Sequence, residues 1–248
     1  MNYLVGDIGN TTIKLSILNK SFKIIKIYNL NTHKIFNNSL KKNFLNKFLK
    51  RNINKKVLIS SVVPNVFKKI KKYLSKRKFK VYEIKDLKVK KILKMKIKNY
   101  NQLGSDRISN AIGSMNYKNT IIIDFGTATT FDIVKNGVYE GGVISPGVNL
   151  SILNLNKSTA LLPLLNLKNN QKSFGKNTQE ALNAGFLWGY EGLINNVIKK
   201  IFLKTKSNFK IVLTGGYAKL FRNRINYKTV IDQNITIKGI AIAYKELL

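Results

Sequence analysis

The sequence has 248 residues, which is enough for one large domain or for two domains of about 120 residues each. Its hydrophobic content of 44% is ordinary for a globular protein, and no apolar run approaches the ~18 residues that span a bilayer. The lack of cysteine excludes disulfides, thiolate catalysis and cysteine metal sites. The single histidine, His33, lies in a polar stretch, which argues against a Ser-His-Asp triad and a histidine-rich metal site.

The charge is extreme, with 45 Lys and Arg against 11 Asp and Glu and a formal net charge of +34. Such a balance is typical of nucleic-acid-binding proteins, but it is also what the codon usage of an AT-rich genome produces. Only five of the basic residues are Arg, and the lysines are scattered through every segment. We therefore favour codon usage and expect no specific nucleic-acid partner, although the charge should speed the capture of anions such as ATP.

The first half of the chain predicts an α/β domain. The order of elements, counted from the opening strand, is β-β-β-α-β-α-β, and the stretch at 85–103 is a Lys-rich connection or mobile flap. Pro64 suits the first position of its helix, and Ser105 suits the N-cap of a helix that runs from 104 to 112. The further strands are expected at 13–18, 22–28, 57–63 and 79–84, and the further helices at 40–50 and 64–75.

The second half repeats the opening of the first. Strands are expected at 121–124, 130–134, 137–139 and 209–213, and helices at 147–156, 178–203 and 239–248. The Gly- and Pro-containing segment 141–147 predicts a sharp bend of the backbone. We therefore divide the chain into an N-terminal domain at 1–117 and a C-terminal domain at 118–248. The N-terminus enters a strand at once, without the long apolar core of a signal peptide, so a cytoplasmic location is expected.

Residues 120–130 carry the most informative pattern in the chain. Three isoleucines lead into Asp124, and Gly126 then opens a turn with the hydroxyls of Thr127, Thr129 and Thr130. A buried strand thus delivers a carboxylate beside a turn whose backbone N–H groups suit an anion and its counter-cation. Residues 4–14 form a similar motif around Asp7, so we infer an internal duplication with a nucleotide between the halves.

Several motifs together resemble those of the type III pantothenate kinases, which belong to the actin-like ATPase superfamily of acetate and sugar kinases. The resemblance spans nearly the whole chain, with the motifs in the family's order and spacing. It implies two ribonuclease-H-like domains with a nucleotide cleft between them. Ser105 departs from the family, which usually has Ala there. The motifs are D-I-G-N-T-T-I-K at 7–14, G-S-D-R at 104–107, D-F-G-T-A-T-T at 124–130, G-G-V-I-S-P-G at 141–147 and T-G-G at 214–216.

The resemblance implies ATP-dependent phosphorylation of pantothenate to 4′-phosphopantothenate, the first step of coenzyme A biosynthesis. ATP, Mg²⁺ and a monovalent cation, K⁺ or NH₄⁺, are the implied cofactors. Asp7 would hold Mg²⁺ through water, since Mg²⁺ keeps much of its hydration shell, and Asp124 would bind the monovalent cation. The implied ATP-binding residues are Asp7, Ile8, Gly9, Asn10, Thr11, Thr12, Ile13, Lys14 and Thr127.

The same resemblance makes Asp106 the general base. Its place at a helix start favours the ionised form and lowers its basicity, but a weak acceptor suffices where the hydroxyl proton leaves late. Arg107 offers a fork of donors for the pantothenate carboxylate, and Thr178 is either a substrate contact or a plain N-cap. The implied substrate-binding residues are Tyr100, Gly104, Ser105, Asp106, Arg107 and Thr178.

Family members are homodimers, so a second copy of the chain is an expected partner. The apolar residues Phe186, Leu187, Trp188 and Tyr190 would serve that contact or the core. Two other functions stay open: a nucleic-acid-binding regulator on a relic kinase fold, or another enzyme of the superfamily, such as a sugar or acetate kinase or a phosphatase. The G-S-D-R motif at 104–107 argues against the last group.

Overall fold

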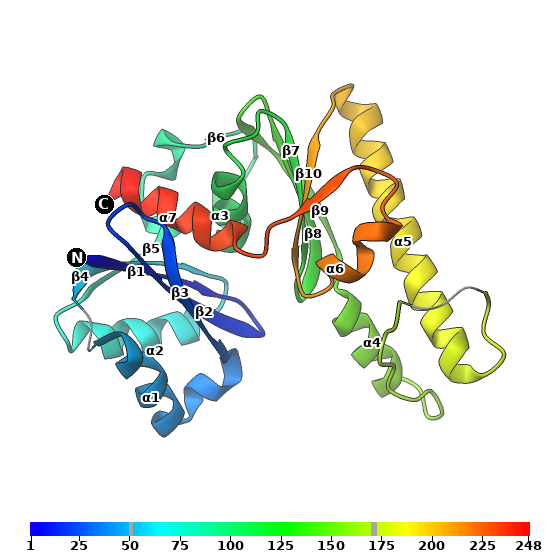
Figure 1. The fold of residues 1–248 in the computed structure, drawn as a ribbon, viewed down its shortest axis with the longest axis horizontal. Coiled ribbons are helices and arrows are strands. Elements are labelled where there is room, and N and C mark those ends of the chain that lie inside the picture. The colour runs from blue at the N-terminus through cyan, green and yellow to red at the C-terminus, as the bar shows by residue number, and fades with distance from the viewer. Residues whose placement is uncertain (50–51, 170–172) are drawn as a thin grey trace. The chain divides into compact units, whose positions relative to one another are not determined.

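The computed structural model describes residues 1–49, 52–169 and 173–248 (Figure 1). The chain forms two compact units, each built on a mixed β-sheet with helices. Unit 1 comprises residues 1–118, 136–141 and 234–248, and unit 2 comprises residues 119–135 and 142–233. This confirms the α/β fold class that the order of elements predicts.

The sheet of unit 1 has five strands in the order β3-β2-β1-β4-β5. Strand β1 pairs antiparallel with β2 and parallel with β4, and β4 pairs parallel with β5. The carboxyl ends of β1, β4 and β5 therefore meet at one edge, where ligands bind in open α/β sheets. The strands are β1 Asn2–Ile8, β2 Thr12–Leu18, β3 Ile24–Asn31, β4 Ile53–Ser61 and β5 Lys80–Glu83.

Helices α1 (Asn38–Leu49) and α2 (Pro64–Ser75) pack into the core of this unit. Helix α2 begins with Pro64 as predicted, and its residues Val66, Ile70 and Leu74 recur every fourth position to form a buried stripe. The predicted helix at 40–50 is confirmed up to residue 49, while Lys50 lies outside the described residues.

The C-terminal helix α7 (Ile235–Leu247) packs against helix α3 (Ser105–Gly113), as Figure 1 shows. The two helices approach closely because glycines lie at the contact. A Cβ atom added to Gly239 would lie 1.8 Å from the carbonyl oxygen of Ser109, so only glycine fits there. This packing assigns residues 234–248 to unit 1, whereas the sequence predicted a continuous second domain at 118–248.

The Lys-rich segment at 85–103 has more structure than the predicted connection or flap. It holds the short strand β6 (Lys94–Met95), which pairs in parallel with Val138 and Tyr139 of β9. Val89 and Leu93 are buried and anchor the segment. Its 3₁₀ turns are η2 Ile84–Asp86, η3 Val89–Lys91 and η4 Tyr100–Gln102.

The second sheet has the order β11-β10-β7-β8-β9-β6, and its first five strands repeat the topology of unit 1. Strand β7 pairs antiparallel with β8 and parallel with β10, as β1 does with β2 and β4. The repeated sequence motif predicted this repetition. The strands are β7 Thr120–Phe125, β8 Ala128–Lys135, β9 Val138–Pro146, β10 Lys210–Gly215 and β11 Thr229–Ile231.

The sharp bend predicted at 141–147 is wrong. Residues 141–146 continue strand β9, and the positive φ of Gly141 (+123°) is the only left-handed backbone angle among them. Gly147 then serves as the N-cap of helix α4 (Val148–Lys157). Sheet pairing within β9 thus outweighs the local preference of Gly and Pro for turns.

The helices predicted at 147–156 and 178–203 are confirmed as α4 and α5 (Thr178–Thr205). In α5, Leu187 and Tyr190 join the core, while Trp188 keeps 44% of its surface exposed. The sequence missed helix α6 (Ala218–Phe221) and strand β11, both of which are short. Within the described part of the chain, no helix combines the length and the apolar character needed to cross a membrane.

Candidate active site

Three hydrogen bonds hold the turn between β1 and β2. Cross-strand pairing sets Asp7 opposite Lys14 and Ile8 opposite Ile13, so residues 9–11 form the tip. The Gly9 N–H donates to the Thr12 carbonyl at 3.0 Å. Thr32, which is buried, donates its hydroxyl to the Gly9 carbonyl at 2.7 Å and its N–H to the Thr11 carbonyl at 2.9 Å.

This arrangement divides the predicted ATP-binding residues into two groups. Ile8 and Ile13 are fully buried, so only their backbone atoms are available to a nucleotide. The Ile8 carbonyl already accepts from the Val62 N–H at 3.1 Å. The polar side chains at the turn are exposed or half-buried: Asn10, Thr11, Thr12 and Lys14 can donate to phosphate oxygens, and Asp7 can face a cation.

Helix α3 begins with the predicted acid in its first turn. The N-cap is Gly104 and not Ser105, which is the first helical residue and is 2% exposed. A Cβ added to Gly104 would lie 2.5 Å from Oδ1 of Asp106, so glycine leaves space for that carboxylate. Oδ1 of Asp106 also accepts from the Arg107 N–H at 2.8 Å.

Burial raises the pKa of Asp106 above its ordinary value. The Arg107 N–H and the Arg107 guanidinium lower the pKa, but burial is the largest effect. The expectation that the helix start would lower the basicity of Asp106 is therefore wrong, because desolvation dominates. A raised pKa makes this carboxylate a better proton acceptor for an alcohol than an exposed Asp.

Glu83, at the carboxyl end of β5, was missed by sequence reasoning. Its Oε1 accepts from the Ser61 N–H at 3.3 Å and its Oε2 from the Lys85 N–H at 2.7 Å. The Ser105 side chain also hydrogen-bonds this carboxylate, and burial raises the pKa of Glu83. Glu83 could have been suspected as a site residue because it lies at the end of a parallel strand in a chain with few carboxylates.

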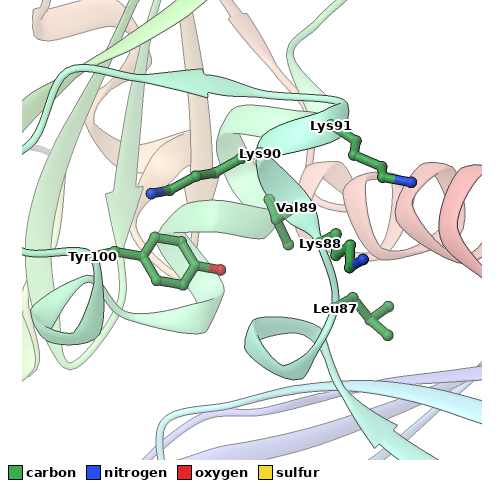
Figure 2. A pocket seen from close by; sticks show the side chains of 6 residues that line it. All are labelled: Leu87, Lys88, Val89, Lys90, Lys91 and Tyr100. Atoms are coloured by element: carbon green, nitrogen blue, oxygen red, sulfur yellow. The ribbon is translucent and has the colours of Figure 1, made fainter.

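Tyr100 lines a pocket of about 480 Å³ in unit 1, shown in Figure 2. Its hydroxyl points toward Val89 and has no hydrogen-bond partner among the described residues. The Nζ atoms of Lys85 and Lys90 each lie 5.9 Å from the centre of the Tyr100 ring. Burial, and then the negative charges of Glu83 and Asp86, raise the pKa of this phenol.

A second pocket, of about 370 Å³, includes the start of α3. Lys85 lines this pocket and also lies near the Tyr100 ring of the first pocket. Unit 1 therefore brings together Tyr100 and the start of α3. The second pocket is lined by Ser61, Val62, Pro64, Phe67, Glu83, Lys85, Asn101, Gln102, Leu103, Gly104 and Ser105.

In unit 2, the turn between β7 and β8 holds the second predicted carboxylate. Asp124 pairs with Thr130 across the hairpin and with Thr214 of β10 on its other side. The Gly126 N–H donates to the Ala128 carbonyl at 3.1 Å and closes the turn. Thr127 is exposed at the tip, where a nucleotide can reach it.

Two glycines from other motifs close around this turn. A Cβ added to Gly147 would lie 2.1 Å from the Thr127 carbonyl oxygen. A Cβ on Gly215, whose φ is +84°, would lie 2.5 Å from the Phe125 carbonyl oxygen and 2.7 Å from Oδ1 of Asp124. The three motifs of unit 2 thus converge on one turn, although they are far apart in sequence.

Thr178 is the exposed first residue of α5, and the N-cap is Asn177. Oδ1 of Asn177 accepts from the Glu180 N–H at 2.9 Å, and Oε2 of Glu180 accepts from the Lys176 N–H at 2.9 Å. This reciprocal pair is close to a capping box. The alternative that Thr178 itself caps the helix is therefore wrong, and its hydroxyl is left for another role.

The described residues contain no cluster of three or more His, Asp or Glu side chains that suits a metal ion. Asp7 lies near the end of β1 and Asp124 near the end of β7, each beside a turn of oxygen and N–H groups. A single carboxylate suits a Mg²⁺ ion that keeps most of its water, and oxygen donors suit a hard monovalent cation. The donor types therefore fit both predicted ions. A shared cleft for Asp7, Asp106 and Asp124 stays a prediction.

Known proteins resemble this chain over most of its length. The family model of the type III pantothenate kinases matches residues 3–200. A type III pantothenate kinase from Pelagibacter ubique (strain HTCC1062) is 47% identical over 239 residues, which cover 96% of each chain.

Solved structures show the same fold. A Campylobacter jejuni protein described as a Baf family transcriptional activator has a TM-score of 0.64 at 22% identity and 98% coverage of both chains. An inorganic polyphosphate/ATP-glucomannokinase from Arthrobacter sp. strain KM has a TM-score of 0.53 at 12% identity and 97% coverage of both chains. At such identities the two structures support the fold alone.

Proposed function

Because the chain belongs to the type III pantothenate kinase family, we propose that it transfers the γ-phosphoryl group of ATP to the 4′-hydroxyl of pantothenate, in the first step of coenzyme A biosynthesis. The observation that carries this proposal is the start of α3. There Gly104 leaves space for the Asp106 carboxylate, and burial raises the pKa of that carboxylate.

Asp106 acts as the general base. The 4′-oxygen of pantothenate bonds to the γ-phosphorus, the bond from phosphorus to the ADP oxygen breaks, and Asp106 takes the hydroxyl proton. Transfer of this kind depends mainly on positioning and on stabilisation of charge. Arg107 binds the pantothenate carboxylate, Tyr100 and Thr178 contact the substrate, and Gly104 and Ser105 form the wall beside it.

The two turns bind the nucleotide and its ions. In unit 1 the tip at 9–11, Thr12 and Lys14 bind phosphate oxygens, and Asp7 holds Mg²⁺ through water. In unit 2 Thr127 contacts ATP, and Asp124 holds K⁺ or NH₄⁺. When bound, the ions neutralise the negative charge of the phosphates.

A second copy of the chain is the proposed partner. Unit 2 exposes several large apolar side chains, and exposed apolar surface is typical of protein–protein interaction sites. We place the reaction in the cytoplasm, where ATP and Mg²⁺ are abundant. Among these exposed residues are Leu161, Leu164, Phe174 and Trp188, of which Leu161 keeps 91% of its surface exposed.

The first test is ATP turnover with and without pantothenate, in the presence of Mg²⁺ and K⁺. We expect consumption of ATP only when pantothenate is present. Asp106→Asn should lower kcat by about 10²–10⁴-fold, the usual contribution of general base catalysis, and should leave ATP affinity nearly unchanged. Glu246→Gln, at an exposed glutamate of helix α7, is the matched control.

The pH profile tests the same role. The base works only when it is ionised, so activity should fall as pH drops through the pKa of Asp106. Because burial raises that pKa, the fall should begin at a higher pH than the ordinary Asp value of 3.8 would give. Full turnover by Asp106→Asn would reject the assignment.

A further inference from the structure

Glu83 occupies a position that none of the proposed nucleotide or substrate contacts uses. It lies at the carboxyl end of β5, on the edge of the sheet where β1 and β4 also end. It is one of only 11 carboxylates in a chain with 45 basic residues. Among the described residues, its carboxylate accepts hydrogen bonds from two backbone N–H groups and from one hydroxyl.

These three donors belong to three different segments. Ser61 ends β4, Lys85 lies in the 3₁₀ turn η2, and Ser105 is the first residue of helix α3. The Lys85 N–H donates at 2.7 Å and the Ser61 N–H at 3.3 Å, and hydrogen bonds to a carboxylate are stronger than neutral ones, so a single side chain links the three segments. Burial of a carboxylate is costly without such bonds, so these hydrogen bonds are needed to keep Glu83 at this position.

In this chain the start of α3 is anchored from outside the helix. Its N-cap is Gly104, which has no side chain, and no side-chain hydrogen bond caps the helix. Ser105 is buried and lies next to Asp106, so its bond to Glu83 is the nearest fixed point to the proposed base. Since Gly104 passes so near the Asp106 carboxylate, a small shift of this loop would displace that carboxylate.

We propose that Glu83 is a positioning residue for the reaction: through Ser105 it fixes the start of α3 against β4 and η2, and so holds Asp106 in place. The inference rests on the proposed role of Asp106 as general base. Glu83 and Ser105 both line the pocket of about 370 Å³ beside this loop, so the anchor is part of the wall on that side.

The test compares Glu83→Ala, Glu83→Gln, Ser105→Ala and the double variant Glu83→Ala/Ser105→Ala. Glu140→Gln, at a half-exposed glutamate of the same unit that pairs with Lys96, is the matched control. Glu83→Ala should lower kcat about tenfold to a hundredfold, because misplacing a catalytic group by about 1 Å costs up to that much. ATP affinity should change much less than kcat, since none of the three donors to the Glu83 carboxylate lies in the β1–β2 turn.

The other variants separate positioning from folding. Glu83→Gln keeps one acceptor oxygen and should recover part of the lost kcat. Ser105→Ala should lower kcat by a few-fold with little change in melting temperature, and should have no further effect in the Glu83→Ala background. Glu140→Gln should match the wild type.

The inference is overturned if Glu83→Ala or Ser105→Ala keeps the wild-type kcat, or if their effects simply multiply in the double variant. It is also overturned if kcat falls only in proportion to the loss of folded protein. A wild-type protein that does not phosphorylate pantothenate would reject the proposed function, and the positioning role with it. Normal wild-type turnover together with an unaffected Glu83→Ala would reject the positioning role alone.

Discussion

The two carboxylate-bearing hairpins share a topology but differ in what faces the acid. In unit 1 Asp7 pairs with Lys14 across β1 and β2, whereas in unit 2 Asp124 pairs with Thr130 across β7 and β8. Residues paired in this way share a face of the sheet. The first hairpin therefore offers a cation next to its acid, which suits phosphate, and the second offers only oxygen ligands, which suit a cation.

The two turns are also held by different means. In the first, the Thr32 side chain and backbone bind the carbonyls of Gly9 and Thr11. In the second, Gly147 and Gly215 let neighbouring backbone pack directly onto the turn. A turn held by hydrogen bonds leaves its tip open for N–H groups to face a ligand. A turn enclosed by backbone is rigid, which suits a site whose ligand oxygens must keep their spacing.

The largest expected effect comes from exchanging the two acids for their amides. Asp7→Asn should lower kcat by about 10²–10³-fold, because it removes a group that stabilises charge in the transition state. Asp124→Asn should lower activity about tenfold, with the loss concentrated in the response to K⁺. Titrations of activity with Mg²⁺ and K⁺ should show a weakened Mg²⁺ response only in Asp7→Asn. The same ion response in both variants would contradict the division of roles.

A smaller effect is expected where backbone packs on the second turn. Gly147→Ala would set a Cβ 2.1 Å from the Thr127 carbonyl oxygen, and both sides of this contact are backbone. We expect a loss of about 1–3 kcal/mol in the free energy of unfolding, as overpacking usually costs. Thermal and urea unfolding measure it.

Gly185→Ala is the matched control in the same unit. A Cβ there meets no atom within 4 Å, and the residue lies inside helix α5. This change should stabilise the protein by about 0.5–1 kcal/mol, since alanine is the better helix former. If Gly147→Ala and Gly185→Ala lowered the free energy of unfolding equally, the second turn would not be enclosed by backbone.

Strong local signals made most of this fold predictable. The run of isoleucines before Asp124 and the repeated Asp-x-Gly pattern specified both central hairpins, and Pro64 marked the start of α2. The two carboxylates at the hairpin ends followed from the same pattern. These features depend on neighbours within a few residues, so they can be interpreted from the chain alone.

The parts that escaped prediction depend on contacts between distant residues. Gly147 and Gly239 matter because remote backbone approaches them, and the second of these draws the last helix onto unit 1. The raised pKa of Asp106 results from burial, which local sequence does not reveal. Glu83 stands outside every motif, and only the meeting of β4, η2 and α3 gives it three donors.

The smallest expected effect tests the hydrogen bonds that hold the first turn. Thr32→Val removes the hydroxyl that donates to the Gly9 carbonyl and keeps the volume of the buried side chain. A lost hydrogen bond of this kind costs about 0.5–1.5 kcal/mol. The turn should become less ordered, so the KM for ATP should rise a few-fold while the KM for pantothenate stays unchanged.

Thr205→Val is the control for this change. It removes a hydroxyl that donates to the Ile201 carbonyl at 2.7 Å within α5, far in sequence from either turn. It should leave both KM values as they are. If Thr32→Val also leaves the KM for ATP unchanged, the open tip of the first turn does not depend on Thr32, and the contrast between a hydrogen-bonded turn and an enclosed one no longer explains how each hairpin binds its ligand.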